Sequence, residues 1–250
     1  MYSYHYLVLI INASQEILDH TPVVKHRIHK IKGRTYQSYY FRDTATNKIR
    51  EYAEQTPRGQ KLKTVFEMRK KAEMKLNQHL DAWKTCFKYP CPRIDLSKLR
   101  QKAQSAVITK EVYDSLVPLS NKHPVTNPNP YKGITFRSKS EREMAEYLDS
   151  VGIEYKYEPL MHIGADNIVI YPDFVCYISE LGFGFVIEHF GMLDSPDYFD
   201  RMMRALRMYL GSGYVPGNDI LFTYERSTCP PRKNYFESQI NCVLDNLCAA

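Results

Sequence analysis

The sequence predicts an α/β domain with a mixed sheet in the second half of the chain, preceded by a basic α+β region. Three observations support this. From about residue 131 the periodic segments follow the order helix, three strands, helix, strand, helix. The 250 residues are 44% hydrophobic and 13% aromatic, which is ample for a packed core. The charge also differs sharply between the two halves.

Residues 1–130 carry 23 Lys and Arg against 11 Asp and Glu, whereas residues 131–250 carry 11 against 17. Lys and Arg bind the phosphates of nucleic acids, and Asp and Glu bind metal cations, so this charge asymmetry indicates a nucleic-acid-binding part joined to a metal-dependent one. Ordinary variation in surface charge is the simpler alternative. The segment SNKHPVTNPNPYKG, residues 120–133, has the composition of a linker. We therefore expect a basic α+β region over 1–125, binding nucleic acid or a protein partner, and a second domain over 126–250.

The apolar run YLVLII, residues 6–11, suggests a strand; it lacks the flanks of an export signal, and eighteen apolar residues never run together. Residues 25–52 mix β-branched, aromatic and basic residues around turn signals at Lys32-Gly33 and Thr46-Asn47, which predicts a small antiparallel sheet. Its interleaved tyrosines and cations suit either phosphate contact or simple packing.

Residues 58–85 contain no proline and place their apolar residues at helical spacings, which predicts a long, basic, amphipathic helix. Its Arg69, Lys70 and Lys71 are the residues that we expect to contact nucleic acid. A further helix is expected from Asp95.

The cysteines show no disulfide framework. Two of them, Cys86 and Cys91, lie close together, but no second Cys or His pair with finger-like spacing follows, so we expect no zinc site. A chain of this length without a cysteine framework indicates a reducing, cytoplasmic location.

The second half has clear helix and strand boundaries. Ser138 occupies an N-cap position, with Glu141 three residues later and Gly152 after the last turn. Strand-like runs follow at 153–158, 168–178 and 182–190. A helix then opens at Ser195-Pro196 and closes at Gly211, before a strand at 219–225 and a helix at 234–247.

Three acidic residues stand at informative places on these elements. Asp173 follows Pro172, Glu188 ends the apolar run FGFVIE, and Glu141 projects from the start of the inward helix face. Hard divalent cations prefer several oxygen ligands, and such clusters can support phosphodiester cleavage. Each residue also has a plainer interpretation: a capping box for Glu141, a strand end for Asp173, and an ion pair with a following Arg for Glu188.

The element order together with SKSE, YKYE, YPDF and EHFGM resembles the restriction-endonuclease-like, or PD-(D/E)XK, nuclease superfamily over about residues 131–225, and a bacterial and mobile-element branch in particular. The resemblance implies an αβββαβ core with a mixed central sheet. It also implies a DNA endonuclease that hydrolyses phosphodiester bonds, in which Asp173 and Glu188 hold Mg²⁺ or Mn²⁺ and Glu141 is the helix acid.

The sequence departs from the Glu-x-Lys motif of that family, because Phe190 stands at the lysine position. His189 is a candidate general base and Lys156 a candidate replacement for the cation. Strand alternation directs His189 away from Glu188 unless a bulge re-aims it, and a buried, hydrogen-bonded histidine is an equal alternative. The missing lysine leaves a second hypothesis, a catalytically inactive module that binds nucleic acid or assembles with a mobile-element partner.

Arg201 and Arg204 share one face of the helix after this motif, where they either reach DNA phosphates or form a solvated surface. The expected partner is DNA and not a membrane. A homodimer or a mobile-element protein partner remains open.

Overall fold

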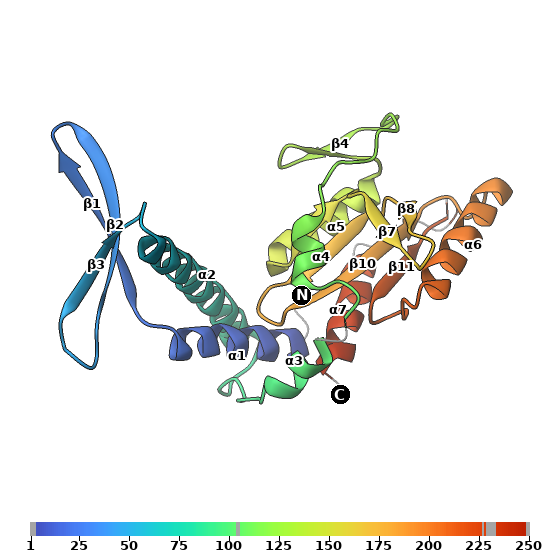
Figure 1. Cartoon of the computed structure of the whole chain (residues 1–250). Coiled ribbons are helices and arrows are strands. Elements are labelled where there is room, and N and C mark those ends of the chain that lie inside the picture. Colours follow the sequence, from blue (N-terminus) through green and yellow to red (C-terminus); the bar gives the residue numbers. More distant parts are fainter. Residues whose placement is uncertain (1–3, 104–105, 227, 229–233, 249–250) are drawn as a thin grey trace. The chain divides into compact units, whose positions relative to one another are not determined.

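The computed structural model describes residues 4–103, 106–226, 228 and 234–248 (Figure 1). The chain divides into two compact units: an N-terminal unit, Leu7–Ile94, and a C-terminal unit, Asp95–Ala250 together with Met1–Tyr6. Within the described residues, no helix has the length and apolar character that a membrane span requires. Cys229 and the side chain of Cys248 lie outside the described part of the chain.

The N-terminal elements are α1 (Tyr4–His20), β1 (Val24–Ile31), β2 (Arg34–Arg42), β3 (Ile49–Ala53) and α2 (Pro57–Cys86). The strand predicted at residues 6–11 is wrong, because this run lies inside the 17-residue helix α1. Every residue from 6 to 13 is buried. A short run that is apolar on all sides carries no period, so it cannot distinguish a buried strand from a buried helix.

The predicted small sheet is confirmed, with antiparallel order β1–β2–β3. Lys32 and Gly33 form the tight β1–β2 turn with φ values of 49° and 76°, both in the left-handed region that two-residue hairpin turns need. One face of the sheet packs on α2, where the rings of His26 and Tyr39 lie 5.9 and 5.6 Å from that of Phe66. The long helix is also confirmed, capped by Thr56.

The C-terminal unit has mixed α/β structure. Its elements are α3 (Ser97–Ala103), α4 (Lys110–Ser115), β4 (Asn129–Tyr131), β5 (Ile134–Phe136), α5 (Lys139–Val151), β6 (Glu154–Tyr157), β7 (Met161–Ile163), β8 (Ile168–Ile170), β9 (Phe174–Ile178), β10 (Phe183–Phe190), α6 (Pro196–Gly211), β11 (Ile220–Tyr224) and α7 (Tyr235–Cys248). The central sheet has the order β11–β10–β9–β6. Strand β9 is antiparallel to both β6 and β10, and β10 is parallel to β11.

The ends of α5 are as predicted, with Ser138 Oγ accepting from the Glu141 N–H and Gly152 in the left-handed conformation at φ 74°. The single strand predicted over 168–178 is instead two strands in two sheets. Strand β8 pairs with β7 in a separate hairpin, and β9 joins the central sheet. Pro172 lies between them, and a residue without an N–H ends ladder pairing.

Residues 95–125, which the sequence analysis assigned to the basic region, belong to the C-terminal unit. Ile108 forms a β-bridge with Gly184 of β10, and its side chain is completely buried. Tyr113 and Leu116 join the same core. The units therefore separate between Ile94 and Asp95 rather than near residue 125, because these apolar side chains are buried against the central sheet.

The central sheet is covered on both faces. On one, which we call the α6 face, Val175 and Val186 pack with Ile108 and with Tyr209 of α6. On the other, the α5–α7 face, Tyr147 of α5 donates a hydrogen bond to the Asn241 side chain of α7 at 2.9 Å. Because side chains alternate along a strand, Glu188 belongs to the α6 face with Val186.

Candidate active site

Asp173 and Glu188 lie opposite each other where β9 and β10 meet. The last antiparallel pair is Ile187 with Phe174, so one further step aligns Asp173 with Glu188 on the α6 face. Asp173 Oδ2 accepts a hydrogen bond from the His189 N–H at 2.7 Å. The backbone of β10 thus holds the Asp173 carboxylate, and the backbone N–H of Asp173 in turn lowers the pKa of Glu188.

Two tyrosines of α6 reach this pair. The hydroxyl of Tyr209 donates to Glu188 Oε1 at 2.5 Å. Tyr198 accepts a hydrogen bond from the Gly191 N–H at 3.2 Å. Burial raises the pKa of Tyr198, and the charges of Asp173 and Glu188 raise it further. The sequence did not predict either tyrosine at the acidic pair, although their spacing of eleven residues, three helical turns, places both on one face of the helix.

Burial raises the pKa of Asp173 well above its ordinary value, and the negative charges of Glu188 and Glu141 raise it further. Burial also raises the pKa of Glu188 to about 7, against the opposing effect of the Tyr209 hydrogen bond. Glu141 and Glu158 add repulsion to both carboxylates. Four acids therefore share one electrostatic environment in which full ionisation is unfavourable.

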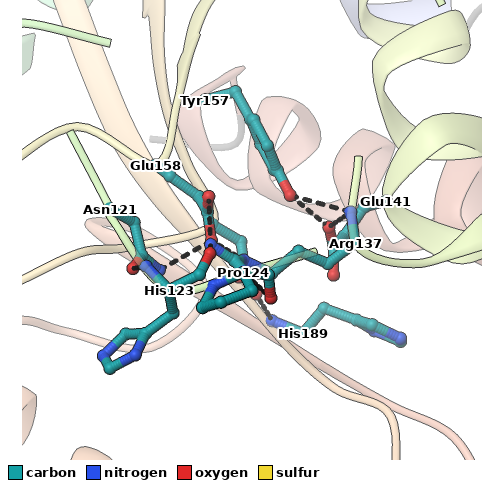
Figure 2. Close-up of polar contacts among 9 residues, drawn as sticks. Asn121, His123, Pro124, Arg137, Glu141, Tyr157, Glu158 and His189 are labelled. Carbon is teal, nitrogen blue, oxygen red and sulfur yellow. Dashed lines mark hydrogen bonds and ion pairs between the residues drawn. The ribbon is translucent and has the colours of Figure 1, made fainter. Parts of the chain in front are cut away.

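Glu141 is buried at the start of α5. Its Oε2 accepts hydrogen bonds from the Arg137 N–H at 3.0 Å and from the Tyr157 hydroxyl at 2.6 Å (Figure 2). A full capping box would direct this carboxylate to the N–H of Ser138. Here the carboxylate accepts instead from the N–H of Arg137, the residue before Ser138. Glu141 is therefore fixed in place, close enough for its charge to raise the pKa of Asp173.

A partly buried ion pair between Arg137 and Glu158 lies beside the acidic pair. Arg137 Nε and Nη2 donate to the two oxygens of Glu158, and its terminal nitrogens also donate to the carbonyls of His123 and Pro124 (Figure 2). The Glu158 N–H donates to the Asp173 carbonyl at 3.1 Å. No helical or strand spacing connects Arg137 with Glu158, so this ion pair was not predictable from the sequence.

The His189 ring lies on the α5–α7 face, away from Glu188. Its Nδ1 is 2.9 Å from Thr223 Oγ1, its Nε2 is 3.6 Å from Glu225 Oε2, and its edge contacts the ring of Phe236. In Figure 2 the His189 ring points away from Glu158. Only the backbone N–H of His189 contacts the acidic pair, through its hydrogen bond to Asp173. This placement favours the alternative of a buried, hydrogen-bonded histidine over that of a general base.

The Lys156 ammonium is bound at the end of α4. Its Nζ donates to the carbonyls of Tyr113, Asp114 and Leu116 at 2.5, 3.2 and 2.6 Å, which occupies all three of its donors. Phe190, at the position of the family lysine, stacks on Phe222 and Tyr224 of β11. The structure therefore does not direct Lys156 towards the two carboxylates.

Of the side chains predicted to contact nucleic acid, four are exposed and one is hydrogen-bonded within the protein. Arg201 is exposed and stacks over the Tyr198 ring at 5.2 Å, and Arg204 is exposed as well. Lys70 and Lys71 are exposed on α2.

Arg69 instead closes the C-terminal end of α1. Its Nη1 donates to the carbonyls of Leu18 and Thr21 at 2.7 and 2.6 Å, and its side chain is only 11% exposed. Since the last carbonyls of a helix lack partners within the helix, this guanidinium has a structural position and is not presented to a phosphate.

Among the described residues, no group of three or more His, Cys, Asp and Glu side chains is arranged to hold a metal ion. The pair Asp173 and Glu188 nevertheless fits Mg²⁺ or Mn²⁺, because Mg²⁺ commonly binds through one or two carboxylates and keeps several waters. A divalent cation would also relieve the repulsion that raises both pKa values.

The chain matches no protein-family model, no curated protein and no solved structure.

Proposed function

We propose that the chain is a divalent-metal-dependent DNA endonuclease with a restriction-endonuclease-like core of the PD-(D/E)XK type. The order α5–β6–β9–β10–α6–β11 supports the proposal, with three antiparallel strands followed by one parallel strand and the β7–β8 hairpin as an insertion. The observation that carries it is the alignment of Asp173 with Glu188 on one face, where burial raises the pKa of both carboxyl groups.

In this proposal Asp173 and Glu188 hold Mg²⁺ or Mn²⁺. The bound metal supplies a Lewis acid and a water of lowered pKa, as phosphodiester hydrolysis requires. Tyr209 orients Glu188 through its hydrogen bond, and Glu141 strengthens the negative potential that attracts the cation. In this proposal Arg201, which lies over the Tyr198 ring, binds a substrate phosphate, and Arg204 extends the same helix face.

The test is cleavage of supercoiled plasmid with Mg²⁺ or Mn²⁺ by the wild-type chain, by Asp173→Ala and by a control, Asp166→Ala. Asp166 is an exposed acid in the β7–β8 turn, so its removal changes the net charge equally without touching the site. We expect cleavage by wild type and control and none by Asp173→Ala. Absence of both cleavage and metal binding in the wild type would refute the proposal.

A second candidate is a catalytically inactive module of a mobile element that binds nucleic acid or assembles with a partner protein. The specific observation in its favour is that Lys156 is bound by carbonyls and that Phe190 fills the lysine position. This candidate predicts tight, salt-sensitive DNA binding without metal that Asp173→Ala leaves unchanged, and no cleavage under any metal condition.

A further inference from the structure

The three-stranded sheet of the N-terminal unit has one face on α2 and one that does not contact it. Tyr39 and His26 point to α2, so the alternating residues of each strand point outwards. The register places seven side chains with basic or aromatic groups on this outer face: Lys25, Arg27, His29, Arg34, Tyr36, Tyr40 and Arg42. All of them are exposed or partly exposed.

The positive charge of the outer face is almost unopposed. Within the three strands, all of whose residues the structure describes, Glu51 is the only acid. Its oxygens accept from Ser38 and from His29 at 2.8 Å and pair with Arg27 at 3.1 Å, and the hydrogen bonds of Ser38 and His29 lower its pKa. Arg27 thus balances Glu51, while Lys25, Arg34 and Arg42 remain as net positive charge.

The dimensions of the sheet match one kind of polyanion. The β1–β2 hairpin is a two-stranded ribbon with strands about 4.8 Å apart, and the major groove of B-DNA, about 12 Å wide, admits a two-stranded β-ribbon. The major groove of A-form RNA is too narrow for this. The two-residue turn at Lys32-Gly33 ends the hairpin without a bulky loop.

We propose that the outer face of β1–β2–β3 seats in the major groove of duplex DNA, with Lys25, Arg34 and Arg42 on phosphates and Tyr36 of the central strand towards the base edges. The inference rests on the proposed DNA partner. It assigns affinity to the sheet, whereas the sequence analysis placed it on the helix at Arg69, Lys70 and Lys71.

The test is metal-free binding of a fluorescent 20-bp duplex by the full chain at several salt concentrations. Lys25→Ala/Arg34→Ala should lower the slope of log K against log salt by about two and weaken binding roughly 30-fold at 0.15 M salt, and Arg42→Gln alone should lower the slope by about one. The matched control is Lys84→Ala/Lys88→Ala. Both lysines are exposed; Lys84 lies about 27 Å along α2 from Phe66, and Lys88 follows the end of this helix. Their loss should leave the slope of log K against log salt nearly unchanged.

Methylation of guanine N7, a major-groove atom, should inhibit binding of the wild type. A sheet variant that binds like the wild type, equal affinity for double-stranded RNA, or no effect of N7 methylation would overturn the inference. If the wild type still shows Asp173-dependent cleavage in those cases, the proposed nuclease stands and only the docking surface fails. If the wild type neither binds nor cleaves DNA, both proposals fail.

Discussion

The two largest sheets among the described residues carry charge in opposite ways. The outer face of β1–β2–β3 presents basic side chains to solvent, where charges cost little free energy, and its one acid is paired. The central sheet is covered on both faces and holds Asp173 and Glu188 where burial raises their pKa. Exposed cations are common on protein surfaces, whereas two adjacent, partly buried like charges are unfavourable without a counter-ion, so the central sheet carries the stronger functional evidence.

The largest expected effect concerns the two partly buried carboxylates of the central sheet, Asp173 and Glu188. Asp173→Asn removes one anionic ligand, so we expect plasmid cleavage to fall roughly a thousandfold, which corresponds to several kcal/mol of metal-assisted catalysis. The same variant should melt at a higher temperature than the metal-free wild type at pH 8, because it removes buried repulsion. Paired cleavage and calorimetry measurements check both effects. Lower stability together with full activity would show that Asp173 is purely structural.

The pH dependence of stability gives the next largest effect. The folded-state pKa of Glu188, about 7, is above its ordinary value, so its contribution to stability is complete below about pH 4.5 and is lost as pH rises through 7. We expect the metal-free protein to lose on the order of 1–3 kcal/mol between pH 5 and 8. Glu51 and Glu225, whose pKa values are lowered, act below this range. Urea unfolding of Glu188→Gln should show a flatter profile, and an unchanged slope would contradict this assignment.

Arg69 is an exception among the basic side chains of the N-terminal unit, because its guanidinium is largely shielded from solvent and hydrogen-bonded to backbone carbonyls. Arg69→Ala should destabilise the protein by about 1.5–3 kcal/mol, because it leaves carbonyls of α1 without their charged donor. The neighbouring change Lys70→Ala, at an exposed position, should cost less than about 0.5 kcal/mol. Denaturant melts of the two variants provide the check. Equal stabilities would mean that the Arg69 contacts contribute nothing.

Tyr209→Phe tests how the central sheet holds its acidic pair. The change removes only the hydroxyl that donates to Glu188, so we expect Mn²⁺ affinity to fall about tenfold with the fold intact. Tyr214→Phe is a matched control, since Tyr214 packs against Tyr209 at a ring distance of 5.3 Å. Isothermal titration with Mn²⁺ distinguishes the two, and identical affinities would remove Tyr209 from the site.

The sequence was most informative where local chemistry decides the structure. Ser138 and Gly152 marked the ends of α5 because capping depends on residues close in the chain. Alternation along β10 correctly directed His189 away from Glu188, and the alignment of Asp173 with Glu188 follows from strand pairing that YPDF and VIEHFG suggest. These features can be predicted from residues that are close in the sequence and from the two-residue alternation of side chains along a strand.

Features that depend on distant contacts were not predictable. The engagement of Lys156 follows from where α4 packs, and the Arg137–Glu158 pair joins residues 21 positions apart. The run at residues 6–11 is buried on all sides in α1, so its sequence contains no helical period. In each case tertiary packing, rather than local propensity, determines the outcome.

The central claim is that Asp173 and Glu188 together bind a divalent cation, and anomalous diffraction from crystals soaked in Mn²⁺ tests it most directly. The proposal predicts an Mn²⁺ peak about 2.1 Å from an oxygen of each carboxylate, which disappears in Asp173→Asn crystals. Crystals that show both side chains ordered, with no Mn²⁺ between them at saturating concentration, would contradict it.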